Sequence, residues 1–237
     1  MLQLAVYDGT INAFDQATVS AHPPTLVGEW MFSNGSANDT GPFSYNSVMN
    51  EAIPTADRAG SPNSAFYFDG VAANIVLGNG TDLNYTDLMS FSCWFRADDL
   101  GSADRIVSKR SSPVAAGWEI NIGSTDKITT NRAGTLNSQA DNPGITPGVW
   151  HHLAFIWEPS AAVEQIKLYL DGVYLSGAVL YAGASLEPPV SAEPLTLGMP
   201  AYAAVLLFNG AIDDVRFYHR ILSPAEVTTL AAEPAIP

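Results

Sequence analysis

The stretch Ile166-Lys-Leu-Tyr-Leu-Asp-Gly-Val-Tyr-Leu175 contains the pattern that decides the fold. Its first five residues alternate between aliphatic side chains and Lys167 or Tyr169, as in a strand with one buried face, and Asp171-Gly172 is a typical two-residue hairpin turn. The same alternation recurs in short runs, such as 64–69, 90–96 and 118–122, separated by Gly, Pro, Asn, Asp and Ser. The sequence therefore predicts many short strands in antiparallel sheets.

One short helix is predicted near the C-terminus. Ser223 stands at the N-cap position, Pro224 follows at the first helical position, and Glu226 comes three residues after the serine, which together make a capping box. Dense strands with one short terminal helix are typical of an all-β fold, here an antiparallel two-sheet β-sandwich of the jelly-roll type. No internal repeat indicates a propeller or a solenoid.

Composition limits the function. The chain has 237 residues, of which 47% are hydrophobic and only 14% are charged, so it can bury a large core and is not intrinsically disordered. It has 10 basic and 24 acidic residues and a net charge of −14, which argues against the positive face that nucleic acids need. We therefore expect no nucleic-acid partner. The single cysteine, Cys93, excludes an intramolecular disulfide framework.

The chain divides into three parts. Residues 1–24 have too few apolar side chains for a core of their own and end at His22-Pro23-Pro24, so we expect an N-terminal arm or attachment segment with a linker. Residues 25–232 are predicted to form the sandwich, and 233–237 a tail. No signal-peptide pattern and no apolar run long enough for a membrane helix is found, so we expect no membrane insertion.

Several segments, in order along the chain, resemble the laminin-G-like, concanavalin A-like jelly roll. They are Leu26–Phe32, Ala65–Gly70, Met89–Phe95, Gly148–Ala154, Lys167–Gly172 and Phe208–Tyr218, the last leading into 222–227. The resemblance implies a jelly roll across roughly residues 26–230. Lectins, adhesion modules, pentraxins and hydrolases share this fold, so the resemblance leaves the function open.

Catalysis is not favoured. Laminarinase-like members of the fold place paired carboxylates at alternate positions of one strand, but none of the nine glutamates here has an acidic residue two positions away. Cys93 lies in a predicted strand, where a buried hydrophobe is the ordinary interpretation. His151 and His152 are adjacent on a strand, so they point to opposite faces and cannot bind one ion. We predict a chain that is not an enzyme.

Ligand binding is expected at loops on the rim of the sandwich, where 33–47, 137–148 and 181–194 are the widest candidates. Sugars stack on aromatic faces, and the candidate side chains are Phe43, Tyr45, Tyr85, Tyr181 and Tyr202. The alternative is that these aromatics cover the ends of the core or an interface between copies.

The resemblance also implies a structural Ca²⁺ at the rim, with Asp69, Asp213 and Asp214 as candidate ligands. The alternative is that these aspartates form turns and accept local backbone amides.

We expect a non-catalytic recognition or structural module that binds glycans or cell-surface ligands. The arm suggests a virion-associated protein (capsid decoration, head fibre or tail fibre), in which residues 1–24 contact a capsid or tail protein. The hydrophobic content of 47% also leaves room for a subunit interface in a homo-oligomer. The expected location is the virion surface or the extracellular space. One alternative is a secreted or surface-attached bacterial carbohydrate-binding or adhesion domain, and another is a glycoside hydrolase-like enzyme with an unrecognised site.

Overall fold

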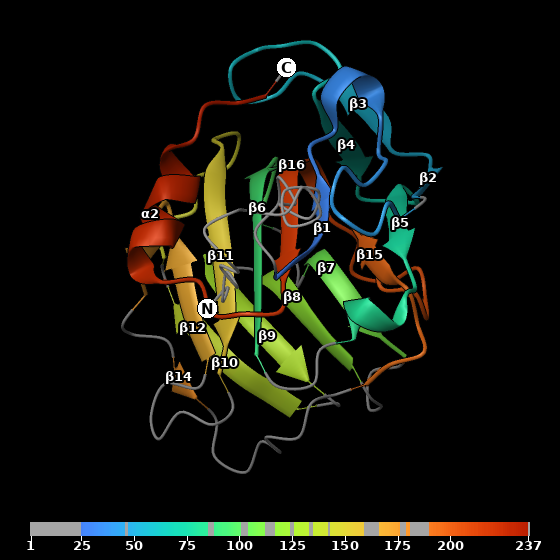
Figure 1. Ribbon diagram of the computed structural model, residues 1–237. Coiled ribbons are helices and arrows are strands. Elements are labelled where there is room, and N and C mark those ends of the chain that lie inside the picture. Colours follow the sequence, from blue (N-terminus) through green and yellow to red (C-terminus); the bar gives the residue numbers. More distant parts are fainter. Residues whose placement is uncertain are drawn as a thin grey trace, which may run out of the picture.

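The computed structural model describes most of the chain after residue 24. The described residues are 25–45, 47–84, 88–100, 104–111, 117–123, 126–132, 135–141, 143–158, 166–175, 179–180 and 190–236. The predicted arm at 1–24 lies outside them. Two antiparallel β-sheets pack face to face, and one α-helix follows the last strand (Figure 1), which confirms the predicted all-β sandwich class.

The first sheet has eight strands among the described residues. Seven of them lie in the order β13 (Val173–Tyr174), β12 (Ile166–Leu170), β11 (His151–Trp157), β6 (Met89–Ala97), β16 (Asn209–Tyr218), β4 (Ala65–Asp69) and β3 (Ile53–Thr55). The eighth, β1 (Leu26–Trp30), pairs with the C-terminal half of β16, whereas β4 pairs with the N-terminal half. The β12–β13 hairpin turns at Asp171-Gly172, as the sequence predicts.

In the part of the chain that the structure describes, the second sheet also has eight strands. Their order is β14 (Val179–Leu180), β10 (Thr135–Asp141), β9 (Lys127–Arg132), β8 (Gly117–Gly123), β7 (Asp104–Arg110), β15 (Leu195–Leu197), β5 (Asn74–Gly78) and β2 (Val48–Asn50). The 3-10 turns η1 (Ser33–Gly35) and η2 (Thr81–Leu83) lie in connections. The prediction of a wide loop at 137–148 is wrong in its first part, because 137–141 belong to β10; this strand lacks the strong apolar alternation on which the prediction relied.

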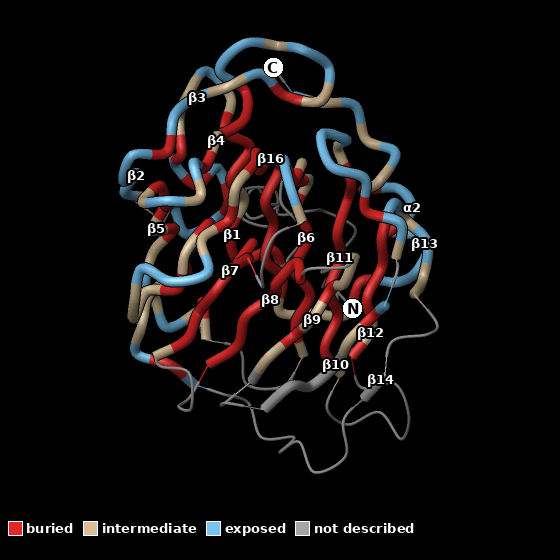
Figure 2. Tube along the Cα trace, turned by 180° about the vertical axis from the view of Figure 1, so that it is seen from behind, coloured by how far each residue is buried: buried red, intermediate tan, exposed pale blue. Residues whose placement is uncertain are grey.

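Alternation along the strands places one face of each sheet in the core. Figure 2 shows the central strands buried along their length, and β7, β8 and β11 are buried at every position. No helix among the described residues is long and apolar enough to cross a membrane.

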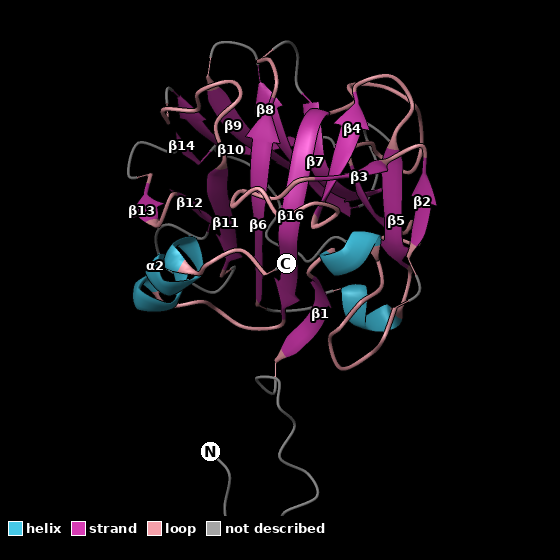
Figure 3. Ribbon diagram, turned by 90° about the horizontal axis from the view of Figure 1, so that it is seen from above, coloured by secondary structure: helices cyan, strands magenta, loops and turns pink. Residues whose placement is uncertain are grey.

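The C-terminal helix, α2 (Pro224–Ala232), lies on the outer side of the first sheet (Figure 3). A separate apolar cluster joins Val227 and Leu230 of α2 to Ala154, Ile156 and Tyr169 of the sheet. The predicted capping box is present: the Glu226 amide donates to Ser223 Oγ, and the Ser223 amide donates to Glu226 Oε2 at 2.8 Å. The helix and the tail that follows it therefore cover part of this face.

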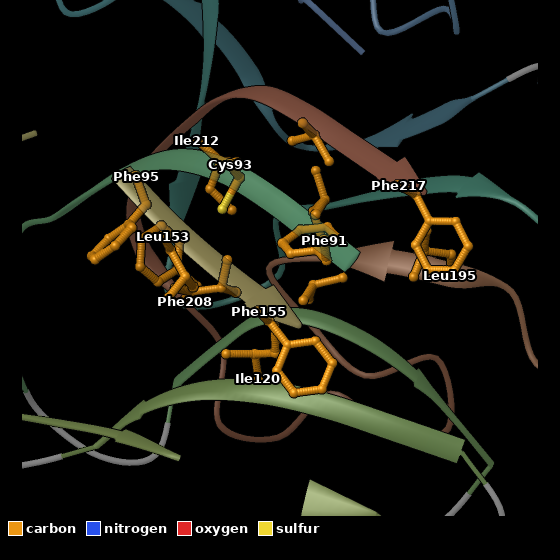
Figure 4. Close-up of a cluster of buried hydrophobic side chains, with 14 of the residues drawn as sticks. Phe91, Cys93, Phe95, Ile120, Leu153, Phe155, Leu195, Phe208, Ile212 and Phe217 are labelled. Carbon is orange, nitrogen blue, oxygen red and sulfur yellow. The ribbon is translucent and has the colours of Figure 1, made fainter. Parts of the chain in front are cut away.

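The core between the sheets contains Phe91, Cys93 and Phe95 of β6, which face Ile120 of β8 and neighbours from other strands (Figure 4). In β16 both Ile212 and Phe217 face this core although an odd number of positions separates them. A β-bulge between Asp213 and Arg216 inserts the one extra residue that makes this possible.

Candidate functional site

A ladder of three aromatic rings leads from the core to the surface at one end of β1. The buried ring of Trp30 stacks on Tyr45, with 6.4 Å between centroids, and Tyr45 stacks on Phe43 at 6.0 Å. Phe43 is 51% exposed. The outermost ring of the ladder is therefore exposed to solvent, and it lies in the predicted rim loop at 33–47.

Asp39 holds this loop in place. Its carboxylate is buried, and Oδ1 accepts the amides of Glu29 at 2.8 Å and Gly41 at 2.7 Å, while Oδ2 accepts the amide of Tyr45 at 3.0 Å. The Thr40 hydroxyl donates to Glu29 Oε2 at 3.2 Å. The loop is thus tied to β1 before any ligand arrives, which lowers the ordering entropy that binding must overcome.

Tyr45 supports the ladder from beneath. Its hydroxyl donates to Asp82 Oδ2 at 3.4 Å, and its ring lies so close to Gly80 that a side chain there would collide with it. Burial and the nearby Asp82 carboxylate raise the pKa of the Tyr45 hydroxyl. Phe43 is consequently the ring that can meet a ligand, whereas Tyr45 positions it and packs against the core, as the alternative interpretation expects.

The other predicted aromatics do not join this ladder within the described chain. Tyr202 is half-buried in a turn after β15. Tyr85 and Tyr181 lie outside the described residues. Phe43 and Tyr45 are therefore the two predicted ligand-binding residues that the structure brings together.

The aspartates predicted to bind calcium have other partners. Oδ1 of Asp69 accepts the amides of Val71, Ala72 and Ala73 at 2.8–2.9 Å, and these hydrogen bonds lower the pKa of Asp69. Asp69 pairs with Asn209, four positions before Asp213 on β16, so the two aspartates are about 13 Å apart along the strand.

These positions do not fit one calcium site formed by the three aspartates. No cluster of three potential metal-ligating side chains is found among the described residues. Asp69 instead closes a local turn, which is the alternative that the sequence left open. Calcium binding elsewhere stays a prediction.

Asp213 and Asp214 form a buried cluster with Arg58. Arg58 Nη1 lies 3.1 Å from Asp213 Oδ2 and 2.6 Å from Asp214 Oδ2, and the guanidinium stacks 4.4 Å from the centroid of the Trp94 ring. Burial and the neighbouring Asp214 charge raise the pKa of Asp213 to about 8, although Arg58 opposes the shift. Arg58 Nη2 also donates to the Glu233 carbonyl at 3.1 Å, so the cluster fastens the tail to the sheet.

The two adjacent histidines lie on opposite faces of β11, as predicted. The Thr146 amide donates to His151 Nε2 at 3.1 Å, which leaves Nδ1 to donate to Asp171 Oδ2 at 2.7 Å. His152 packs on the other face against Trp94. His151 therefore joins the β12–β13 turn, through Nδ1, to the loop before β11, through Nε2, and the pair has a structural role.

The outward face of β8 carries a polar cluster that sequence reasoning missed. Glu119 is fully buried, and its carboxylate accepts hydrogen bonds from Arg105 at 2.9 Å, from Arg110 and from Asn131 at 3.2 Å. Lys109 of β7 lies apart from this cluster, because it pairs with Trp118 of the core; its Nζ donates to the Glu193 carbonyl at 2.6 Å, and burial lowers the pKa of this lysine to about 8. The sequence signal that could have pointed to these buried charges was the concentration of three of the ten basic residues within β7.

The geometry defines a class of protein, a two-sheet, lectin-like jelly roll with a solvent-facing aromatic ring on its rim. The family model of the concanavalin A-like lectin/glucanases superfamily matches residues 66–228, more than two thirds of the chain, and the protein belongs to this superfamily. No curated protein matches the sequence.

Solved structures share the fold at low sequence identity. Domain 4 of AbnA, a GH43 extracellular arabinanase from Geobacillus stearothermophilus in complex with arabinotriose, is 21% identical, with a TM-score of 0.66 over 87% of this chain and 98% of that one. A structure of botulinum neurotoxin type C, whose cell entry depends on two ganglioside molecules, is 11% identical, with a TM-score of 0.65 over 88% and 51% of the two chains.

The binding domain of Paraclostridial Mosquitocidal Protein 1 is 16% identical, with a TM-score of 0.64 over 87% of this chain and 52% of that one. The protein thus spans about half the length of these toxin chains. At these identities the likeness to all three structures shows the fold alone.

Proposed function

We propose that the protein is a non-catalytic carbohydrate-binding module that holds a sugar ring against Phe43. The exposed, stacked Phe43 ring on a loop tied down by Asp39 carries the proposal. The C–H face of a sugar can cover such a ring, and burying a phenylalanine side chain contributes about 1.5–3 kcal/mol.

The neighbours support the choice of ligand, because one was solved with arabinotriose and another depends on gangliosides. A hydrolytic role has less support. Retaining hydrolysis needs two carboxyl groups facing a substrate, whereas the adjacent pair Asp213 and Asp214 is buried and bound to Arg58.

The test is a calorimetric titration of the full-length protein with neutral oligosaccharides, including arabinotriose. Phe43→Ala should weaken binding by roughly tenfold to a hundredfold, as expected for the loss of ~1.5–3 kcal/mol of apolar burial. Phe43→Tyr should bind nearly as the wild type does. Val71→Ala is the control, since Val71 is 73% exposed and belongs to another loop. Equal affinities of Phe43→Ala and the wild type for the sugar would show that Phe43 is not part of the binding site.

A finer part of the proposal is that the module is displayed on a virion through residues 1–24. It rests on the sequence alone, because these residues lie outside those that the structure describes. Immunogold labelling of purified particles tests it, with a version lacking residues 1–24 as the comparison. Labelling that is independent of residues 1–24 would contradict the proposed anchor. If the protein is instead a secreted bacterial adhesion domain, the antibody should label bacterial cell surfaces.

A further inference from the structure

A groove lies on the outer side of the first sheet, between β1, the end of β16 and α2. Its volume is about 470 Å³, within the range typical of small-ligand sites. Three leucines line it, Leu26, Leu222 and Leu230, all of which belong to the apolar cluster beneath α2. The groove thus has an apolar floor formed by largely buried leucines, against which the C–H face of a sugar ring could pack.

Charged side chains of both signs stand around this apolar part. Arg216 lies 3.0 Å from Glu29 Oε1 and 2.9 Å from Glu233 Oε2. Arg220 Nη1 lies 2.7 Å from Glu226 Oε1. The three carboxylates outnumber the two guanidiniums, and each guanidinium is already paired with a carboxylate.

These groups are held in position without a ligand. Glu226 Oε2 accepts hydrogen bonds from the amide and hydroxyl of Ser223, both at 2.8 Å, so the helix cap orients this carboxylate. The Arg220 guanidinium stacks 5.3 Å from the centroid of the Tyr218 ring, which also lines the groove. A ligand would therefore meet preset donors and acceptors rather than mobile side chains.

The charge pattern selects the ligand. A sugar hydroxyl can donate to a carboxylate and accept from a guanidinium at once, so a neutral polyol matches mixed walls of this kind. An anionic sugar would meet an excess of carboxylates in a chain of net charge −14.

We propose that this groove is a second carbohydrate site, separate from Phe43, which takes a neutral sugar and rejects sialylated or sulfated ones. The proposal rests on the proposed carbohydrate-binding function. Glu29 links the two sites, because it lines the groove and accepts the hydroxyl of Thr40 from the loop that carries Phe43.

The test uses two matched variants on exposed positions of α2. Thr229 lines the groove and Thr228 does not, so Thr229→Arg places a bulky cation in the groove whereas Thr228→Arg makes the same charge change beside it. Both are titrated in full-length protein with a neutral oligosaccharide, with circular dichroism as the check on folding. Thr229→Arg should remove one of two binding events, and Thr228→Arg should keep both. Arg220→Ala should weaken the same event by roughly tenfold.

The Phe43→Ala variant distinguishes a failure of the groove proposal from a failure of the proposed carbohydrate-binding function. In that background the remaining binding should come from the groove, should be lost with Thr229→Arg, and should not be seen with a sialylated oligosaccharide. If Phe43→Ala abolishes all binding, the groove is not a site but the proposed function stands. Stronger binding of the sialylated sugar than of the neutral one in that background would overturn the selectivity. A wild-type protein that binds no sugar in the panel would overturn both proposals.

Discussion

Asp213 shows how one inserted residue changes the chemistry of a strand. The bulge in β16 gives Asp214 a positive φ of 48° and places both carboxylates beside Arg58 and Trp94, away from the main core. Two acids beside one arginine leave a surplus negative charge in a buried place, and protonation of Asp213 relieves it. The cluster therefore couples the stability of the fold to pH.

The sign of this coupling follows from the pKa of Asp213, which rises from 3.8 to about 8 in the folded protein. Between these values the folded chain holds more protons than the unfolded chain, so the free energy of unfolding falls as the pH rises. Burial lowers the pKa of His152 from 6.5 to about 4, which has the opposite effect, but only below pH 6.5. The contribution of Lys109 begins only above its lowered pKa of about 8.

We expect the Tm to fall between pH 6.5 and pH 8, the window in which Asp213 acts without His152. Asp213→Asn should flatten that fall, which corresponds to a change on the order of 1 kcal/mol in the free energy of unfolding. Differential scanning calorimetry at several pH values measures it. Asp69→Asn is the control, because the pKa of Asp69 is lowered and lies outside the window. An unchanged slope in Asp213→Asn would contradict the assignment.

Helix α2 is the element that depends most on local signals. It has nine residues, too few for a stable isolated helix, and only Val227 and Leu230 are buried. Its capping box supplies the first-turn hydrogen bonds that the short helix lacks. The packing of its two buried side chains on Ala154 and Ile156 supplies the remaining stability of the helix. This explains why the Ser-Pro-Ala-Glu signal predicted the helix correctly.

Ser223→Ala should lower the free energy of unfolding by about 1 kcal/mol, because both cap hydrogen bonds of the side chain are lost. For a chain of this size the expected fall in Tm is about 2–4 °C. Ser223→Asp should restore most of the stability, since aspartate is also a good N-cap. Thermal unfolding monitored by circular dichroism gives both values. A Tm of Ser223→Ala equal to that of the wild type would show that packing alone holds α2.

The strands were predictable wherever one face is apolar and the other polar, as in β6, β8 and β12. The polar strand β10 was missed, because the apolar alternation in its sequence is weak, and its place in the sheet follows from its pairing with β9. The rim loop that carries Phe43 was expected, but the Asp39 hydrogen bonds that shape it have no signature in the sequence.

The two sheets form one continuous core, so access to its centre requires global opening of the described sandwich. Cys93 is fully buried in that core, and burial raises the pKa of its thiol. Both effects suppress the thiolate that reacts with alkylating reagents. The reactivity of Cys93 is therefore a probe of whole-molecule unfolding.

Iodoacetamide should leave Cys93 unmodified in the native protein and should modify it completely in denaturant. Intact mass measured across a denaturant series should show labelling that follows the unfolding transition seen by circular dichroism. Leu153→Ala, which opens a cavity in the same core, should shift both curves to lower denaturant together. Labelling well before unfolding would show that part of the sandwich opens locally.

The amino-acid sequence by itself determined the strands with one apolar face, the α2 cap and the superfamily, because alternation, turn residues and caps are local and act within a few positions. It also showed that no strand carries the alternating acidic residues of a laminarinase-like site. Only the tertiary structure decided which residues meet. Arg58 reaches Asp213 across 155 positions, and Phe43 is backed by Trp30 through Tyr45. The physical reason is that a period of two tells which face a side chain occupies, whereas the choice of neighbouring strand depends on pairing between distant segments.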